Sequence, residues 1–501
     1  MATAALALTS FAVGVGLHVV VFRHGEWDLE ASNLGVLAVA APFAVAVGVD
    51  MVSQRVGASS SSSPVRSSET LWVTGKTATT LVAICILGIY TSMLVYRAFF
   101  HRLGRFPGPF GARLSHFWIA AKGVQSGKEF AVLKQLHGTH GDVVRLGPQT
   151  LSICDPRALE VIHGAGTKCT KAPWYNCLHP MYSLLTDRVG AAHRQRRKAW
   201  EQSFSTKSLR VYEPRVAFWT DKLLANISAQ LQKPVNMGLW LNFYSFDVMG
   251  DLSLGESFGM LDRSEPHWVM HSLHAFMISL AMFSHCTWML LLVQKLPVIS
   301  AESAKFKNWV AMMVDKRMKN PPANQDLYSF ILDDFYAKET PTKQERMNLN
   351  ADGVLSTIAG SDTTAAALTC LFAELATHPT AVRQIQQEVD SLCTTTTAAA
   401  EPDNYALSQL PYLQACLNEV LRLYPAVPSG IQRFTPPGGL KIGDDLFIPG
   451  DTIVQTPQYV FHRDARNFPR PDEFIPERWT TQPELIQNGS VYSPFSIGKL
   501  S

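Results

Sequence analysis

Three long apolar segments near the N-terminus constrain the fold of this chain more than any other feature of its sequence. They cover residues 4–22, 34–52 and 77–96, and each has about the ~20 residues that a helix needs to cross ~30 Å of hydrocarbon. Two alternatives stay open: either of the first two segments is a buried or interfacial helix, or the first is a signal peptide, although no Arg or Lys precedes it. The sequence therefore predicts a membrane anchor over residues 1–104 with about three transmembrane segments.

The charges around these segments give a mixed signal on orientation. Arg97, Arg102 and Arg105 follow the third segment and favour the cytosolic side for everything downstream. The loop before the third segment contains a Ser-rich linker near residues 57–70, and its own basic residues favour the opposite orientation. Prolines at positions 107 and 109 then prevent the helix from continuing, so we expect a stiff joint between the anchor and the rest of the chain.

From residue 105 to residue 501 the pattern is that of a mainly α-helical domain with a minor β-sheet component, large enough to enclose a large cofactor. Short strand-like pieces occur at residues 142–146, 150–154 and 452–455. The net charge of +3 gives no signal for nucleic acid as a partner. The eight cysteines form no CxxC pair, which is typical of free thiols in a reducing compartment.

The segment AGSDTT, residues 359–364, lies inside a helical pattern that covers residues 347–377. Gly360 and two adjacent threonines are poor helix formers there, and the hydroxyl of Thr363 can bond a carbonyl one turn back and loosen the helix. One interpretation is close helix packing over small residues. The other is a notch for a small ligand and a water, in which Asp362 and Thr363 relay protons.

An ExxR pair places Glu419 and Arg422 on one face of a helix that starts near Pro411 and stops before Pro425. Alone, such a pair is usually a solvated ion pair. A second guanidinium, that of Arg478 in the proline-rich segment FIPERW, is a candidate partner for the same carboxylate. A carboxylate held by two guanidiniums would form a fixed structural clamp.

Three further basic residues attract attention because of their setting. His193 and Arg197 lie about one helical turn apart in HRQRRKAW, which indicates either a solvent-facing basic helix or a cation pair for a carboxylate-bearing cofactor. Arg433 is isolated in an apolar segment, and a buried Arg generally needs an anionic partner.

Taken in order, HRQRRKAW, AGSDTT, ExxR, PERW and PFSxG resemble the cytochrome P-450 family of haem-thiolate monooxygenases. The segment FHRDARNFPRPDEFIPERW, residues 461–479, is similar to the family's approach to its haem loop, and residues 245–261 are similar to its membrane-bound fungal branch. The resemblance covers roughly residues 105–501. It implies the cytochrome P-450 fold, with haem b as the cofactor.

The resemblance also implies a role for each motif. Asp362 and Thr363 match the acid–alcohol pair that delivers protons during oxygen activation, and Glu419, Arg422 and Arg478 match a clamp beside the haem. The residues matching positions that contact haem propionates or open the haem loop are His193, Arg197, Arg433, Phe495 and Gly498.

The family pattern F-x-x-G-x-R-x-C-x-G places its iron-binding cysteine directly after Ser501, and no cysteine follows Cys416 in these 501 residues. Leu500 stands where the pattern has Arg. We therefore expect the chain as written to be truncated just before its metal ligand and to be inactive, because the thiolate is the axial ligand that favours O–O cleavage. The alternative is a haem-free, membrane-anchored pseudoenzyme or scaffold. A peroxide-rearranging member is a third possibility, against which Asp362 and Thr363 argue.

With a complete haem loop, the resemblance implies insertion of one oxygen atom into a lipophilic molecule, with fungal secondary metabolism as the expected setting. The expected partner is an NADPH-cytochrome reductase, and the expected location is the endoplasmic reticulum membrane with the catalytic domain facing the cytosol. Residues 267–299, rich in aromatics and Met, are either core or, by family position, the lid over a substrate channel.

Overall fold

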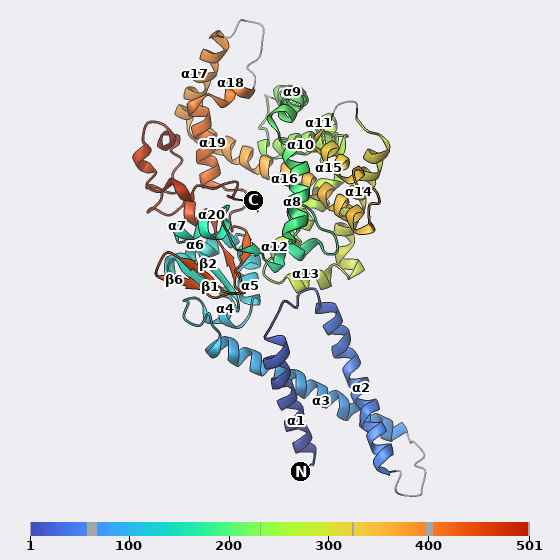
Figure 1. Cartoon of the computed structure of the whole chain (residues 1–501). Helices are drawn as coiled ribbons and strands as arrows, with labels where there is room; N and C mark the ends of the chain where they lie inside the picture. The colour runs from blue at the N-terminus through green and yellow to red at the C-terminus, as the bar shows by residue number, and fades with distance from the viewer. Residues whose placement is uncertain (1, 58–67, 231, 323–324, 396–403, 499–501) are drawn as a thin grey trace.

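The computed structural model describes residues 2–57, 68–230, 232–322, 325–395 and 404–498. Figure 1 shows two parts: three N-terminal helices at the bottom of the view, and a mainly helical body above them that also holds a small sheet. This confirms the predicted fold class. Most of the Ser-rich linker and residues 499–501 lie outside the described residues.

The N-terminal helices match the three apolar segments. They are α1 (Ala2–Leu17), which continues into η1 (His18–Phe22), α2 (Ala31–Gly57), and α3 (Ser68–Val95), which continues into η2 (Tyr96–Phe100). Three stretches, Ala4–Phe22, Ala31–Met51 and Val73–Phe100, are long and apolar enough to cross a membrane. The prediction of three candidate spans is therefore confirmed by length and composition.

Helices α1 and α3 cross with their backbones in contact. A Cβ atom added to Gly14 would lie 2.0 Å from the carbonyl oxygen of Cys85, and one added to Gly88 would lie 2.4 Å from that of Phe11. Ser10 Oγ donates to the carbonyl of Leu81 at 2.6 Å beside this crossing. Small residues that allow close approach, together with hydrogen bonds between helices, are the usual means of association in lipid.

The proline joint packs against the body. The amide of Arg145 donates to the carbonyl of Pro107 at 2.7 Å. Gly108 has a φ of 152°, and a Cβ there would lie 2.5 Å from the carbonyl oxygen of Arg145. The joint is thus tied to the first strand of the sheet.

The body contains the remaining described helices. The first group is α4 (Phe110–Leu114), α5 (Phe117–Ser126), α6 (Glu129–His140), α7 (Pro156–His163), η3 (Pro173–Leu178), α8 (Gly190–Ser203), α9 (Thr206–Ser228), α10 (Met237–Met249), η4 (Gly250–Leu254), α11 (Met260–Arg263), α12 (Trp268–Met282) and α13 (Thr287–Val293). The second group is α14 (Pro297–Lys319), α15 (Leu327–Tyr336), α16 (Lys343–Thr377), α17 (Pro379–Thr395), α18 (Asn404–Ser408), α19 (Pro411–Leu423), α20 (Gln458–His462), η5 (Pro476–Trp479), η6 (Pro483–Leu485) and η7 (Gly489–Val491).

The main sheet has five strands in the order β1-β2-β7-β4-β3. Strand β2 pairs with β7 in parallel, and the other pairs are antiparallel. The three predicted strands correspond to β1, β2 and β7. The bounds are β1 (Val143–Gly147), β2 (Thr150–Ile153), β3 (Thr170–Lys171), β4 (Gln432–Phe434) and β7 (Ile453–Gln455), with a separate hairpin of β5 (Leu440–Ile442) and β6 (Leu446–Ile448).

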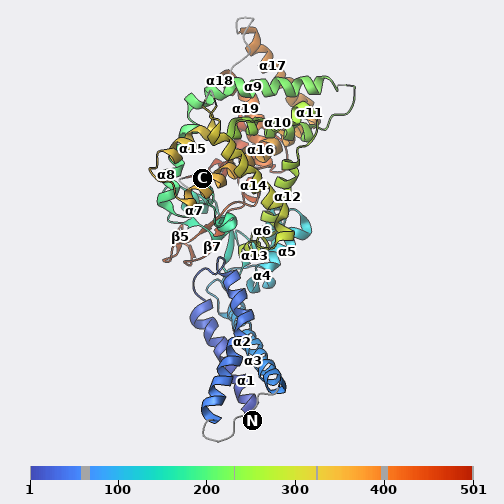
Figure 2. The same ribbon diagram turned by 90° about the vertical axis from the view of Figure 1, so that its right-hand side faces the viewer.

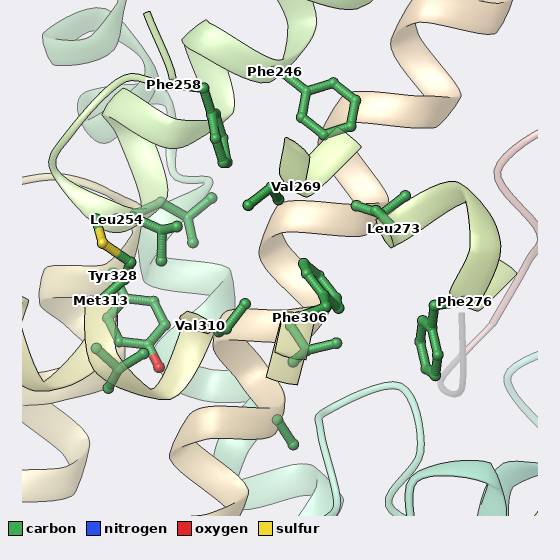
Figure 3. Close-up of a cluster of buried hydrophobic side chains, with 14 of the residues drawn as sticks. Phe246, Leu254, Phe258, Val269, Leu273, Phe276, Phe306, Val310, Met313 and Tyr328 are labelled. Carbon is green, nitrogen blue, oxygen red and sulfur yellow. The ribbon is translucent and has the colours of Figure 1, made fainter. Parts of the chain in front are cut away.

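The long helix α16 runs through the body and packs on the largest apolar core. Figure 3 shows part of this core, in which side chains of α10, α12, α14 and α15 gather, among them Phe246, Leu273 and Val310. Gly353 of α16 fits against α14, because a Cβ there would lie 3.0 Å from Val310. Tyr328 of α15 donates its hydroxyl to the carbonyl of Leu349 at 2.6 Å. These contacts fix the position of α16 in the body.

A buried carboxylate joins α19 to the segment that follows the sheet. Glu419 accepts two hydrogen bonds from Arg422, at 2.8 and 2.9 Å, and one from Arg478 Nε at 2.9 Å. The amide of Ile475 and the indole N–H of Trp479 also donate to it, each at 3.0 Å. The structure thus brings together the three residues expected to form a clamp, and their side chains are fully buried.

The clamp is electrostatically satisfied despite its burial. Burial alone would raise the pKa of Glu419, but the hydrogen bonds and charge of Arg422 and the charge of Arg478 outweigh it and lower that pKa. The guanidinium of Arg422 also donates to the carbonyls of His462 and Pro471, at 2.8 and 2.7 Å. Removing one partner would therefore leave buried charge and carbonyls without compensation.

We predict that Arg478→Met lowers the free energy of unfolding by about 3–5 kcal/mol, the usual cost of breaking a buried ion pair. The matched control is Arg470→Met, because Arg470 pairs with Glu473 at the surface, where such a pair contributes about 0–1 kcal/mol. Thermal unfolding of the full chain in detergent ranks the two variants. Equal midpoints for both would show that the clamp does not hold the fold.

Candidate active site

A cavity of about 450 Å³ lies between α16, α19 and two connecting segments. Its wall is mainly apolar. The lining residues used below are Thr363, Thr364, Ala367 and Leu368 of α16, Leu417, Val420 and Leu421 of α19, and Val427, Ile431, Ser493, Phe495 and Ser496 of the connecting segments. Residues far apart in the sequence, including two of the predicted site residues, therefore meet around one cavity.

Helix α16 remains regular where AGSDTT predicts a loosened helix. Thr363 Oγ1 donates to the carbonyl of Ala359 at 2.5 Å, as expected, yet the α-helical pattern continues without interruption. Gly360 serves close packing, because a Cβ there would lie 2.3 Å from the sulfur of Met249. The packing interpretation is thus confirmed at Gly360. Thr363 lies on the cavity wall, and its role in a proton relay with Asp362 stays a prediction.

Asp362 faces a residue that the sequence reasoning missed. Its Oδ1 lies 3.2 Å from Nε2 of His274 on α12, and the His274 side chain is 44% exposed. The hydrogen bond to Asp362 is the main cause that raises the pKa of His274 above its ordinary value. The contact is therefore strongest at low pH and weakens as pH rises through the raised pKa. No motif marks His274, so only the packing of α12 against α16 could reveal it.

Buried cations gather beside the sheet. Arg433 on β4 is fully buried and donates to the hydroxyl of Tyr175 at 2.8 Å. Its partner in the strand register is Lys171 on β3, which is also buried and donates to the carbonyl of Leu184 at 3.0 Å. His193 on α8 is buried close to both. No motif in the sequence marks Lys171. It lies beside Arg433 only because β3 pairs with β4, and that pairing could not be predicted from the sequence.

The charges of this cluster repel one another. Burial and the charge of Arg433 lower the pKa of Lys171 to about 7. Burial and the charge of Lys171 lower that of His193 to about 4. Arg197 forms an ion pair with Glu201 at 2.7 Å and adds its charge to both shifts. A cluster of this kind is a favourable place for an anion.

Arg196, in the same motif, joins α8 to α16. Its guanidinium bonds the buried carboxylate of Asp352 and donates to the carbonyl of Asn348 at 3.1 Å. Asp352 also accepts the amide N–H of Leu184 at 2.8 Å. The sequence analysis had selected His193 and Arg197 of this motif instead. Arg196 is thus a structural link that sets the position of the cation cluster relative to the cavity wall.

The segment Ser493–Gly498 forms a tight turn at the cavity. The amide of Ser496 donates to the carbonyl of Ser493 at 2.9 Å, and Phe495 projects with 78% of its surface exposed. Gly498 has a φ of 81°, and a Cβ there would lie 2.1 Å from the carbonyl oxygen of His163, so glycine is required. None of the cavity-lining residues in the described part of the chain is a cysteine.

Comparisons with known proteins identify the family of this chain. The family model for cytochrome P-450 matches residues 107–500. Cytochrome P-450 monooxygenase FCK2 of Fusarium pseudograminearum is 44% identical, over 98% of this chain and 86% of the relative. The monooxygenase phqL of Penicillium fellutanum is 35% identical, over 98% and 84%. Tryprostatin B 6-hydroxylase of Aspergillus fumigatus is 36% identical, over 84% and 75%. The chain belongs to the cytochrome P-450 family of monooxygenases.

Proposed function

We propose that this protein inserts one oxygen atom into a lipophilic molecule in fungal secondary metabolism, using haem b. The observation that carries this proposal is the cavity between Thr363 on α16 and the turn at Phe495, with buried cations nearby. One relative is named for the hydroxylation of tryprostatin B, and that relative shares 36% of its residues over the aligned region. The apolar wall suits a lipophilic substrate.

The residues around the cavity fit haem b. The apolar side chains of α16 and α19 suit its ring. Arg433 and Lys171, together with the neutral imidazole of His193 as a hydrogen-bond donor, suit its two carboxylates, with Arg197 as a further cation. When bound through a cysteine thiolate, haem supplies the activation of dioxygen. Phe495 and Gly498 would shape the turn that precedes the thiolate ligand.

Asp362 and Thr363 are proposed to move protons toward the cavity. His274 is partly exposed and contacts Asp362, so a proton can pass from solvent to the carboxylate. The adjacent hydroxyl of Thr363 reaches the cavity wall. The clamp of Glu419, Arg422 and Arg478 is proposed to hold α19 and the segment before the turn in place.

The remaining proposals concern the cellular setting. Electrons would come from an NADPH-cytochrome reductase, and α1–α3 would anchor the protein in the endoplasmic reticulum membrane with its body in the cytosol. The predicted lid, residues 267–299, forms α12, α13 and the start of α14. Part of it is core, because Val269, Leu273 and Phe276 are buried in α12.

We predict that a polypeptide of these 501 residues does not give the reduced, CO-bound Soret band of a thiolate-ligated haem. The expectation follows from the lack of a cysteine among the described lining residues. The same chain extended by Cys-x-Gly should give the band, and one extended by Ser-x-Gly should not. The band from the unextended chain would contradict the proposal. Lack of haem binding in all three would favour the pseudoenzyme or scaffold.

We predict that Thr363→Ala, in the chain extended with the cysteine, increases the hydrogen peroxide released per NADPH consumed. The reason is that a hydroxyl positioned for proton delivery is lost from the cavity wall. The matched control is Thr369→Ala, because Thr369 Oγ1 makes the same kind of bond, to Ala365 at 2.6 Å, on the same helix. Peroxide and NADPH are measured together with reductase present. An equal change in both variants would point to a helix effect alone.

We predict that the contribution of Lys171 to the free energy of unfolding of the cofactor-free protein rises with pH from about 7 toward ~10, because the pKa of Lys171 is lowered in the folded state only. Over that range the unfolded chain binds more protons than the folded one. Lys171→Met should remove the rise, whereas Lys441→Met, at an exposed Lys, should keep it. Thermal midpoints against pH test this.

Bound haem should also flatten the pH profile, because its carboxylates would stabilise the charged form of Lys171. The other charges near Lys171 are Arg433, Asp187, Arg196 and Arg197, and they are unchanged in both variants. Identical profiles for cofactor-free and haem-bound wild type would contradict the assignment of Lys171 to the cofactor's carboxylates.

A further inference from the structure

The connection between α1 and α2, residues 23–30, lies against the catalytic body. Figures 1 and 2 show it at the end of the helices nearest α13, whereas the N-terminus and the Gly57 end of α2 lie at the far end. Neither the predicted anchor nor the family assignment gives this connection a role. Its contacts with the body are specific and polar.

The first contact is an ion pair with two hydrogen bonds. Arg188 Nη1 and Nη2 donate to the two carboxylate oxygens of Glu26, at 2.7 and 2.8 Å. Both side chains are largely shielded, with 23% and 31% of their surfaces exposed. Arg188 Nε also donates to the carbonyl of Lys171 at 3.0 Å, so its guanidinium is held from both sides. A bidentate pair with fixed geometry is the strong form of this interaction.

The second contact is at the start of α13. The amide N–H of Trp288 donates to Asp28 Oδ1 at 3.0 Å. Asp28 is half-buried at this junction, and this burial raises the pKa of its carboxyl group. Nearby, Lys295 Nζ donates to Ser32 Oγ at 2.6 Å. The connection therefore contacts two separate parts of the body, at Arg188 and at α13.

The connection is also braced internally. The indole N–H of Trp27 donates to the carbonyl of His24 at 2.7 Å, and its ring packs edge-on against Phe22 with centroids 5.3 Å apart. The guanidinium of Arg23 lies 4.4 Å from the ring centre of Tyr96, at the end of α3. A loop that is ordered by its own contacts loses less entropy when it docks.

We propose that residues 23–30 form a docking strap that holds the membrane helices to the catalytic body and places this connection on the body's side of the bilayer. The proposal rests on α1–α3 spanning the membrane. It follows that the Ala2 end of α1, the Gly57 end of α2 and the Ser68 end of α3 lie on the opposite side. The strap also fixes which face of the body meets the membrane, namely the face with α13 and the exposed apolar residues Val298 and Ile299.

Cross-linking in membranes tests the strap. The full chain carries Glu26→Cys and Arg188→Cys for the cross-link. Cys393→Ser removes an exposed cysteine, and a protease site is inserted between Gly57 and Ser68. A short bismaleimide is added, and the membranes are then dissolved and cleaved. We expect the N-terminal fragment to stay attached to the body. The controls, each with one cysteine, should release it. So should the pair Glu26→Cys with Arg383→Cys, because Arg383 is exposed on α17, which Figure 1 shows at the far end of the body.

Release of the fragment from the Glu26→Cys, Arg188→Cys chain would overturn the strap. A charge-swap series guards against misfolding: Glu26→Arg alone should speed hydrogen exchange in residues 23–30, and Glu26→Arg with Arg188→Glu should restore slow exchange. Equal exchange in wild type and both variants would also overturn it.

The spanning helices are tested separately with the same inserted site. In sealed vesicles with the cytosolic face outward, added protease should not cut between Gly57 and Ser68, but should cut a site inserted at residues 396–403. Cleavage between Gly57 and Ser68, with the cross-link still formed, would contradict the membrane anchor and leave the strap contact supported.

Discussion

The buried carboxylate of Glu419 is the interaction on which the geometry of the site depends. Its two guanidinium partners come from its own helix and from a segment 59 residues further along the chain. Helix α19 supplies one wall of the cavity, and the segment of Arg478 leads to the turn at Phe495, which supplies another. The carboxylate of Glu419 therefore fixes the position of α19 relative to this turn. Because the three side chains are buried, the loss of any one of them leaves an uncompensated charge and destabilises the whole clamp.

The opposite wall is positioned by a different set of contacts. Helix α16 rests on the large apolar core, and Arg196 links it to α8, which carries His193. The strand pairing of β3 with β4 then brings Lys171 and Arg433 side by side. The cavity and the cation cluster are therefore built on separate elements, and Arg188 connects the cluster's strand to the proposed strap.

The sequence predicts the helical parts well, because long periodic or apolar segments carry strong local signals. The three apolar helices, α16, and α19 with its proline start all lie close to their predicted places. Strands β3 to β6, which were not predicted, have two or three residues each, too few for a period to be recognised. Strand β7 is equally short, and it was predicted from the β-branched residues at 452–454. The sequence also named Glu419, Arg422 and Arg478 as a candidate cluster. It missed His274, Lys171 and the Glu26–Arg188 pair, because each depends on contacts between distant segments.

The position of iron would show directly where the cofactor binds. Iron anomalous scattering, or a cryo-EM map of the haem-loaded, cysteine-extended protein in a lipid disc, locates the cofactor. The account predicts iron in the cavity between Thr363 and the turn at Phe495, with the carboxylates of the cofactor directed to Arg433 and Lys171. Iron at any other place, or carboxylates directed away from this cluster, would contradict it.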